Sequence, residues 1–173
     1  LSIIDLSPLG HQPMVDPETG NTIVFNGEIY NFQLLRAECE SLGDRFNSQS
    51  DTEVILALYR RYGTACLSKL RGMFAFAIWD EKDEKLFAAR DRFGEKPFYY
   101  YEDEGNFIFA SEMKALWAIG VDKQIDNKML LNYITLGYLQ NCIDKEQTFF
   151  EAIYSLPPAH YLSYEPKTNQ LSK

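Results

Sequence analysis

The segment at residues 25–31 (Phe-Asn-Gly-Glu-Ile-Tyr-Asn) combines three groups that can act on a polar substrate. It places the carboxamide of Asn26, the backbone of Gly27 and the carboxylate of Glu28 directly after a predicted strand. Glycine lets the backbone approach a ligand closely, and an exposed N–H beside an amide side chain can stabilise an oxyanion. A plain strand-to-helix turn with Asn31 as the helix cap fits the same residues, and on this segment alone it is the favoured interpretation.

Asp51 is a second candidate for binding a substrate. It lies in Ser-Asp-Thr-Glu (residues 50–53), which has the spacing of a capping box: Ser50 caps a helix and Glu53 reaches back to it. In the first turn of that helix the dipole keeps a carboxylate ionised, so Asp51 could hold a substrate ammonium. A surface acid that only stabilises the helix end explains Asp51 equally simply, and alone it is the better interpretation.

The charged run at residues 90–99 (Arg-Asp-Arg-Phe-Gly-Glu-Lys-Pro-Phe-Tyr) could be a phosphate loop. Phosphate loops rich in glycine lead into the N-terminus of a helix, whereas this run leads into a predicted strand. We therefore expect a turn held by salt bridges within it.

The cysteines offer no clear nucleophile. Cys39 and Cys66 occupy helical positions at which a free cysteine is usually a small core residue. Neither they nor Cys142 lies near a histidine in sequence, so none is predicted to be catalytic. His160 is expected to pack at the start of a strand.

Composition excludes several classes of function. Seventeen Lys and Arg against 25 Asp and Glu give a net charge of −8, which argues against nucleic-acid binding. No apolar run approaches the roughly 20 residues of a membrane span. Three cysteines without a CxxC spacing and two distant histidines, His11 and His160, indicate neither a disulfide framework nor a metal site. A cytoplasmic location is expected.

The elements that must position these residues form an α+β fold. Helices flank a mainly antiparallel sheet, in which four consecutive strands joined by short turns are expected to form a meander. Ser111 and Asp126 are expected to cap two of the helices. The predicted strands are residues 22–25, 73–79, 85–89, 97–101, 106–110 and 160–164; the predicted helices are residues 32–42, 51–62, 111–119 and 126–136.

Both ends of the chain suggest a piece of a longer protein. Leu1 opens an apolar stretch (Leu-Ser-Ile-Ile-Asp-Leu) without Met or a basic leader, and it reads like a strand entered halfway. Residues 167–173 end the chain with no predicted closing element.

Five segments in this order resemble one family: residues 25–31, 50–54 (Ser-Asp-Thr-Glu-Val), 70–77 (Leu-Arg-Gly-Met-Phe-Ala-Phe-Ala), 90–99 and 110–116 (Ala-Ser-Glu-Met-Lys-Ala-Leu). Together they are similar to the glutaminase (class II glutamine amidotransferase) domain of glutamine-hydrolysing asparagine synthetases. The likeness covers residues 1–164. Residues 165–173 would begin a linker to a C-terminal synthetase domain that the chain does not contain.

The resemblance implies a four-layer αββα N-terminal-nucleophile fold, here without its first strand or strands. It implies that an N-terminal cysteine, with its own α-amino group as proton acceptor, attacks the side-chain amide of glutamine. The ammonia released would pass to the synthetase domain, which uses ATP and Mg²⁺ to convert aspartate to asparagine. The resemblance implies no cofactor or metal in the present domain, and a homodimer is possible.

Residue by residue, the resemblance assigns Asn26 and Gly27 to the oxyanion hole. It assigns Glu28 and Asp51 to the α-ammonium of glutamine, and the backbones of Leu1, Ile3 and Ile4 to the walls of the same pocket. Met73 would face an ammonia path between the two domains.

The nucleophile and the arginine that binds the substrate carboxylate would precede Leu1, and none of the three cysteines matches the nucleophile position. We therefore expect the 173 residues alone to be inactive. The alternatives are a degenerate amidotransferase-like domain of the β-lactam synthetase type and a non-catalytic interaction module.

Overall fold

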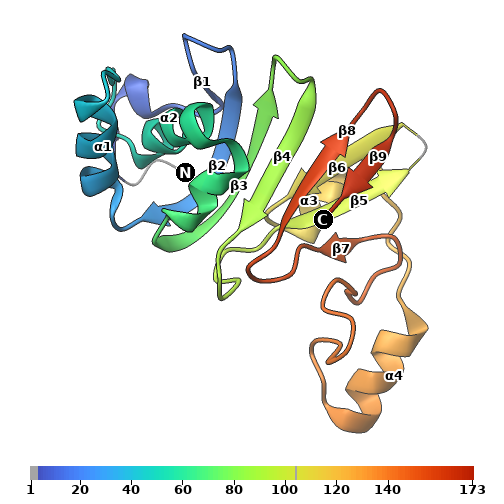
Figure 1. Cartoon of the computed structure of the whole chain (residues 1–173). Helices are drawn as coiled ribbons and strands as arrows, with labels where there is room; N and C mark the ends of the chain where they lie inside the picture. The colour runs from blue at the N-terminus through green and yellow to red at the C-terminus, as the bar shows by residue number, and fades with distance from the viewer. Residues whose placement is uncertain (1–3, 104) are drawn as a thin grey trace.

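Two antiparallel sheets form the centre of the computed structural model, which describes residues 4–103 and 105–173 (Figure 1). The large sheet contains, in spatial order, β1 (Met14–Val15), β2 (Thr22–Ile29), β3 (Gly72–Asp80), β4 (Lys85–Arg90), β8 (Tyr161–Glu165) and β9 (Gln170–Ser172). The small sheet contains β6 (Asn106–Ala110), β5 (Tyr99–Asp103) and β7 (Tyr154–Ser155). The helices are α1 (Phe32–Ser41), α2 (Asp51–Tyr62), α3 (Met113–Ala118) and α4 (Asn127–Leu136), with short 3-10 helices η1 (Pro8–Gly10) and η2 (Gly63–Ser68).

Strand β3 shows how alternating residues build the layers. Phe74 and Phe76 lie in the core against α1 and α2, whereas Ala75 and Ala77 lie in the core between the two sheets. Successive side chains of a strand point to opposite faces, so the large rings fill the space under the helices and the alanines leave room for the small sheet. Each fully buried Phe contributes roughly 1.5–3 kcal/mol of hydrophobic stabilisation.

A third core completes the layers. Strand β5 turns Tyr100 into the space between the sheets, while Tyr99 and Tyr101 pack on the far side with Leu116 of α3. The order is therefore α1 and α2, large sheet, small sheet, α3. This confirms the expected αββα arrangement.

The predicted four-strand meander is wrong. Strand β4 pairs with β3 and β8, and the next two strands, β5 and β6, form the small sheet with β7. The loop after β4 carries the chain from one sheet to the other, and hydrophobic alternation alone does not show that a turn changes sheets.

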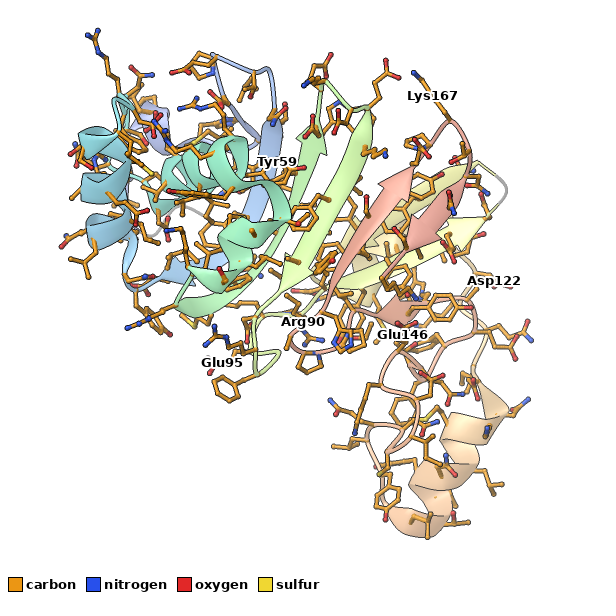
Figure 2. All side chains as sticks on the ribbon, viewed as in Figure 1. Tyr59, Arg90, Glu95, Asp122, Glu146 and Lys167 are labelled. Carbon is orange, nitrogen blue, oxygen red and sulfur yellow. The ribbon has the colours of Figure 1, made fainter. Side chains whose placement is uncertain are left out.

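Hydrogen bonds between charged side chains and backbone groups hold the loop that crosses between the sheets. Arg90 donates to the carbonyl oxygens of Lys96 (2.6 Å), Gly94 (2.8 Å) and Leu156 (2.7 Å). Figure 2 shows it among the loops that join the sheets. Buried Asp91 accepts the N–H groups of four residues: Phe74, Phe93, Glu95 and Lys96. The described loop contains no internal salt bridge, so that expectation is also wrong.

Only some of the helix caps predicted from the sequence are present in the structure. Ser50 caps α2 through the N–H of Thr52 and Asp126 caps α4 through that of Met129, as predicted. Glu53 does not close the capping box, because it accepts the N–H groups of Asn47 and Ser48 instead. Asn31 precedes α1 but gives it no side-chain cap; its carboxamide bridges the backbone of Lys69 and Arg71.

Two C-terminal features also differ from expectation. His160 is exposed, and its Nδ1 lies 2.8 Å from the carbonyl oxygen of Pro158, so it does not pack into the strand start. Gln170–Ser172 close the chain as β9, paired with β8. Residue 164 lies in β8 of this hairpin, and the expected domain limit there stays a prediction.

Helix α4 projects away from the sheets (Figure 1). Met129 is its buried residue, whereas Leu131 and Ile134 are largely exposed. No described helix has the length and apolar character required to cross a membrane.

Candidate functional site

Asn26, Gly27 and Glu28 lie inside β2 rather than in a turn after it. The strand continues to Ile29 because its pairing with β3 runs unbroken from Thr22 to Ile29. The side chains of Asn26 and Glu28 share the face of Val24, which packs toward the space between the sheets. The expected turn is therefore wrong, and the polar groups stand on a rigid element.

Gly27 is required by its surroundings. Its φ is +155°, and a Cβ built on it would lie 2.2 Å from the carbonyl oxygen of Met73 and 2.7 Å from the Cα of Phe74. Any side chain would therefore push β2 away from β3. The sequence identified this glycine as a place of close approach, although the neighbour that approaches is a strand.

Backbone N–H donors and the carboxylate of Asp51 lie along the edge of β2 that faces away from β3. The N–H of Phe25 donates to Oε1 of Gln12 (2.6 Å), and the N–H of Ile29 donates to Oδ2 of Asp51 (3.0 Å). Backbone donors alternate along a strand, so the N–H of Gly27 points to this same edge, between the two occupied positions. A backbone donor and the carboxamide of Asn26 thus stand side by side.

Asp51 is 5% exposed at the first position of α2. Burial raises the pKa of its carboxyl group, the N–H groups of Ile29 and Thr52 oppose the rise, and the negative charge of Glu28 adds to it. From the sequence, the helix dipole is expected to keep Asp51 ionised, but burial has the larger effect on its pKa. A substrate ammonium would relieve the repulsion between the two carboxylates.

The described start of the chain is bound to the loop before α2. Asp5 accepts the N–H of Gln49 through Oδ2 at 2.8 Å, which holds half-buried Ile4 close to the loop before α2. The other two predicted wall residues, Leu1 and Ile3, lie outside the described residues.

A cavity of about 440 Å³ opens between the sheets beside Asn26. Its walls are mostly apolar, including Ala75, Ala77 and Phe98, and its polar side chains are Gln12, Asn26 and Ser111. The Nδ2 of Asn26 donates to Oγ of Ser111 at 3.2 Å. Sequence reasoning missed Ser111 as a site residue, because 85 positions separate it from Asn26 and its place before a helix predicted a cap. That cap is wrong, since Glu112 is the N-cap of α3 and no side chain caps the helix.

The remaining candidates lie elsewhere. Cys39 and Cys66 are buried in the core under the helices, and burial raises the pKa of their thiols to about 11 and about 12. Cys142 is exposed after α4. Among the described residues, no cluster of His, Cys, Asp and Glu could hold a metal ion.

Comparison with known proteins adds the family context. Residues 1–173 match a family described as a glutamine amidotransferase domain. Asparagine synthetase [glutamine-hydrolyzing] 1 of Bacillus subtilis is 48% identical over 139 residues, which cover 80% of this chain and 22% of that protein. Amidase chry2 of Gibberella zeae is 39% identical over 172 residues, 98% of this chain and 24% of that protein. The chain thus spans 22–24% of the length of these relatives.

Two solved structures have a similar fold. The glutamine phosphoribosylpyrophosphate amidotransferase of B. subtilis superposes with a TM-score of 0.65 at 21% identity, covering 94% of this chain and 31% of that one. An allosteric regulatory enzyme of purine biosynthesis gives a TM-score of 0.66, also at 21% identity, covering 94% and 30%. At this identity the likeness concerns the fold.

Proposed function

The chain belongs to the family of glutamine amidotransferase domains, and from this premise we propose that it is the glutaminase domain of a glutamine-hydrolysing asparagine synthetase. One observation carries the proposal: the N–H of Gly27 and the carboxylate of Asp51 lie at one edge of β2, and the carboxamide of Asn26 lies on the adjoining face of the same strand. Donors for an oxyanion and an acceptor for an ammonium are what the two ends of glutamine require.

In the proposed reaction, a cysteine thiolate outside these 173 residues attacks the side-chain carbonyl carbon of glutamine. The carbonyl oxygen gains the negative charge and binds the Nδ2 of Asn26 and the N–H of Gly27. When the C–N bond breaks, ammonia leaves and a γ-glutamyl thioester remains, which water hydrolyses to glutamate. The nucleophile's own α-amino group takes the thiol proton and then delivers it to the leaving amide nitrogen, which departs as ammonia. Glu28 and Asp51 hold the substrate ammonium.

The ammonia would serve a synthetase domain that uses ATP and Mg²⁺ to amidate aspartate. Half-buried Met73 is the second residue of β3 and shares the strand face of Ala75 and Ala77, a position that suits an apolar ammonia path toward such a domain.

A second candidate follows from two of the relatives. Amidase chry2 of Gibberella zeae and amidase chyE of Penicillium rubens match 98% and 100% of this chain at 39% and 36% identity. The full-length protein could accordingly make or cleave an amide other than asparagine. Aspartate-dependent formation of asparagine separates the two candidates.

The test uses the full-length protein and the Asn26→Ala variant. We expect glutamine hydrolysis to fall by about 100-fold or more, the usual effect of removing one oxyanion donor, while asparagine synthesis from free ammonia persists. Asn106→Ala, at the exposed β5–β6 turn, is the matched control and should retain both activities. Unchanged glutamine hydrolysis in Asn26→Ala would refute the assignment.

A further inference from the structure

The contact between Asn26 and Ser111 joins the two sheets at the site. Asn26 lies in β2 of the large sheet, and Ser111 follows β6 of the small sheet. The Nδ2 of Asn26 donates to Oγ of Ser111 at 3.2 Å, and both side chains line the cavity between the sheets.

A carboxamide needs such a partner to work as an oxyanion donor. The terminal torsion of asparagine is broad, so an unheld amide samples many orientations. Nδ2 carries two hydrogens in the amide plane. When one is bound to Ser111, the plane is fixed and the second hydrogen has a defined direction.

The hydroxyl of Ser111 is available for this role because the helix does not use it. Helix α3 begins at Met113 with Glu112 as its N-cap, and no side chain caps it. Gln12, the other polar side chain of the cavity, accepts the N–H of Phe25 through its oxygen. Among the described residues, the carboxamide of Asn26 donates to Ser111 and not to Gln12.

We propose that Ser111 is a positioning residue for Asn26: it accepts one N–H of the carboxamide and thereby directs the other at the carbonyl oxygen of the substrate amide. The inference rests on the proposed function, since it assigns Asn26 to the oxyanion of glutamine hydrolysis.

The test measures steady-state glutamine hydrolysis by the full-length protein. Ser111→Ala should lower kcat by about 10-fold, less than the loss of the donor itself, and change KM for glutamine by less than about twofold. Ser111→Thr keeps the acceptor oxygen and should restore kcat to within about threefold of the wild type. Ser68→Ala removes an exposed hydroxyl that bonds only locally, to the carbonyl oxygen of Ala65, and serves as the control.

A double-mutant cycle decides whether Ser111 acts through Asn26. In an Asn26→Ala background, Ser111→Ala should have no further effect on kcat, because the group it positions is gone. An equal loss in both backgrounds, a kcat within twofold of the wild type for Ser111→Ala, or no rescue by threonine would overturn the inference and leave the proposed function standing. A wild-type protein that does not hydrolyse glutamine would overturn the proposed function itself.

Discussion

At the scale of single residues, the proposed site depends on how burial changes the pKa and the electrostatic strength of an acidic side chain. Asp51 is nearly inaccessible, accepts a backbone N–H and lies close enough to Glu28 for the two charges to repel. An acid in that position binds an ammonium more strongly than an exposed acid does, because the surrounding protein screens the charge less. The sequence could identify Asp51 by its spacing, but it could not show the burial that makes its charge effective.

We expect Asp51→Asn to raise KM for glutamine by about 10-fold or more in the full-length protein, since a charge-assisted contact is worth roughly 1.5–3 kcal/mol. Burial raises the pKa of Asp51, so the wild-type KM should also rise as the pH falls toward that pKa, and the variant should lose this dependence. Steady-state assays from pH 4.5 to 8 measure both effects. Exposed Asp122, which bonds only its neighbour Lys123, provides the control Asp122→Asn. A KM shift below about twofold would show that Asp51 does not bind the substrate.

At the scale of elements, the sequence located most strands and helices but not their partners. The alternation in β3 and the glycine that ends α2 are local patterns, and the structure confirms both elements. Pairing depends on contacts between distant residues: β4 joins β8 across more than 60 positions, and Asn26 meets Ser111 across 85. The loop at residues 90–98 carries the chain from the large sheet to the small sheet, and the side chains of Arg90 and Asp91 hold it in place. They bind backbone groups that cannot be identified from sequence spacing.

Asp91→Asn tests the crossing loop. Burial alone would raise the pKa of Asp91, but the N–H groups of Lys96, Glu95 and Phe93 outweigh it and hold the pKa below its ordinary value of 3.8. The stabilisation is therefore present above about pH 4 and is lost as the pH falls through the lowered pKa. We expect the variant to lose about 2–4 kcal/mol of unfolding free energy at pH 7.

Urea denaturation at several pH values measures this loss. The difference in unfolding free energy between the wild type and Asp91→Asn should decrease below about pH 4. In this range the charge of the wild-type Asp91 carboxylate contributes progressively less to stability as the carboxylate is protonated. Asp83→Asn, at the exposed β3–β4 turn, should stay within about 0.5 kcal/mol of the wild type. A gap that is constant from pH 7 to pH 3 would show that the carboxylate charge does not stabilise the loop.

At the scale of the whole molecule, the proposed binding groups have no suitable thiol nucleophile among the described residues. The proposed oxyanion donors and the acidic pair lie on β2 and α2, which contribute to the same hydrophobic core. Cys39 and Cys66 lie inside that core, where their raised pKa values keep them as neutral thiols at pH 7. Nucleophilic attack needs a thiolate within reach of the substrate carbonyl, and neither buried cysteine meets that requirement.

The isolated 173-residue chain should therefore release no ammonia from glutamine above a buffer blank, whereas the full-length protein should release it. A coupled glutamate dehydrogenase assay measures both. Cys142 is the one exposed cysteine among the described residues, so the variant Cys142→Ser controls for adventitious thiol chemistry. Ammonia release by the isolated chain that survives Cys142→Ser would mean that a different nucleophile lies among these residues, and the oxyanion assignment of Asn26 and Gly27 would have to be rebuilt around it.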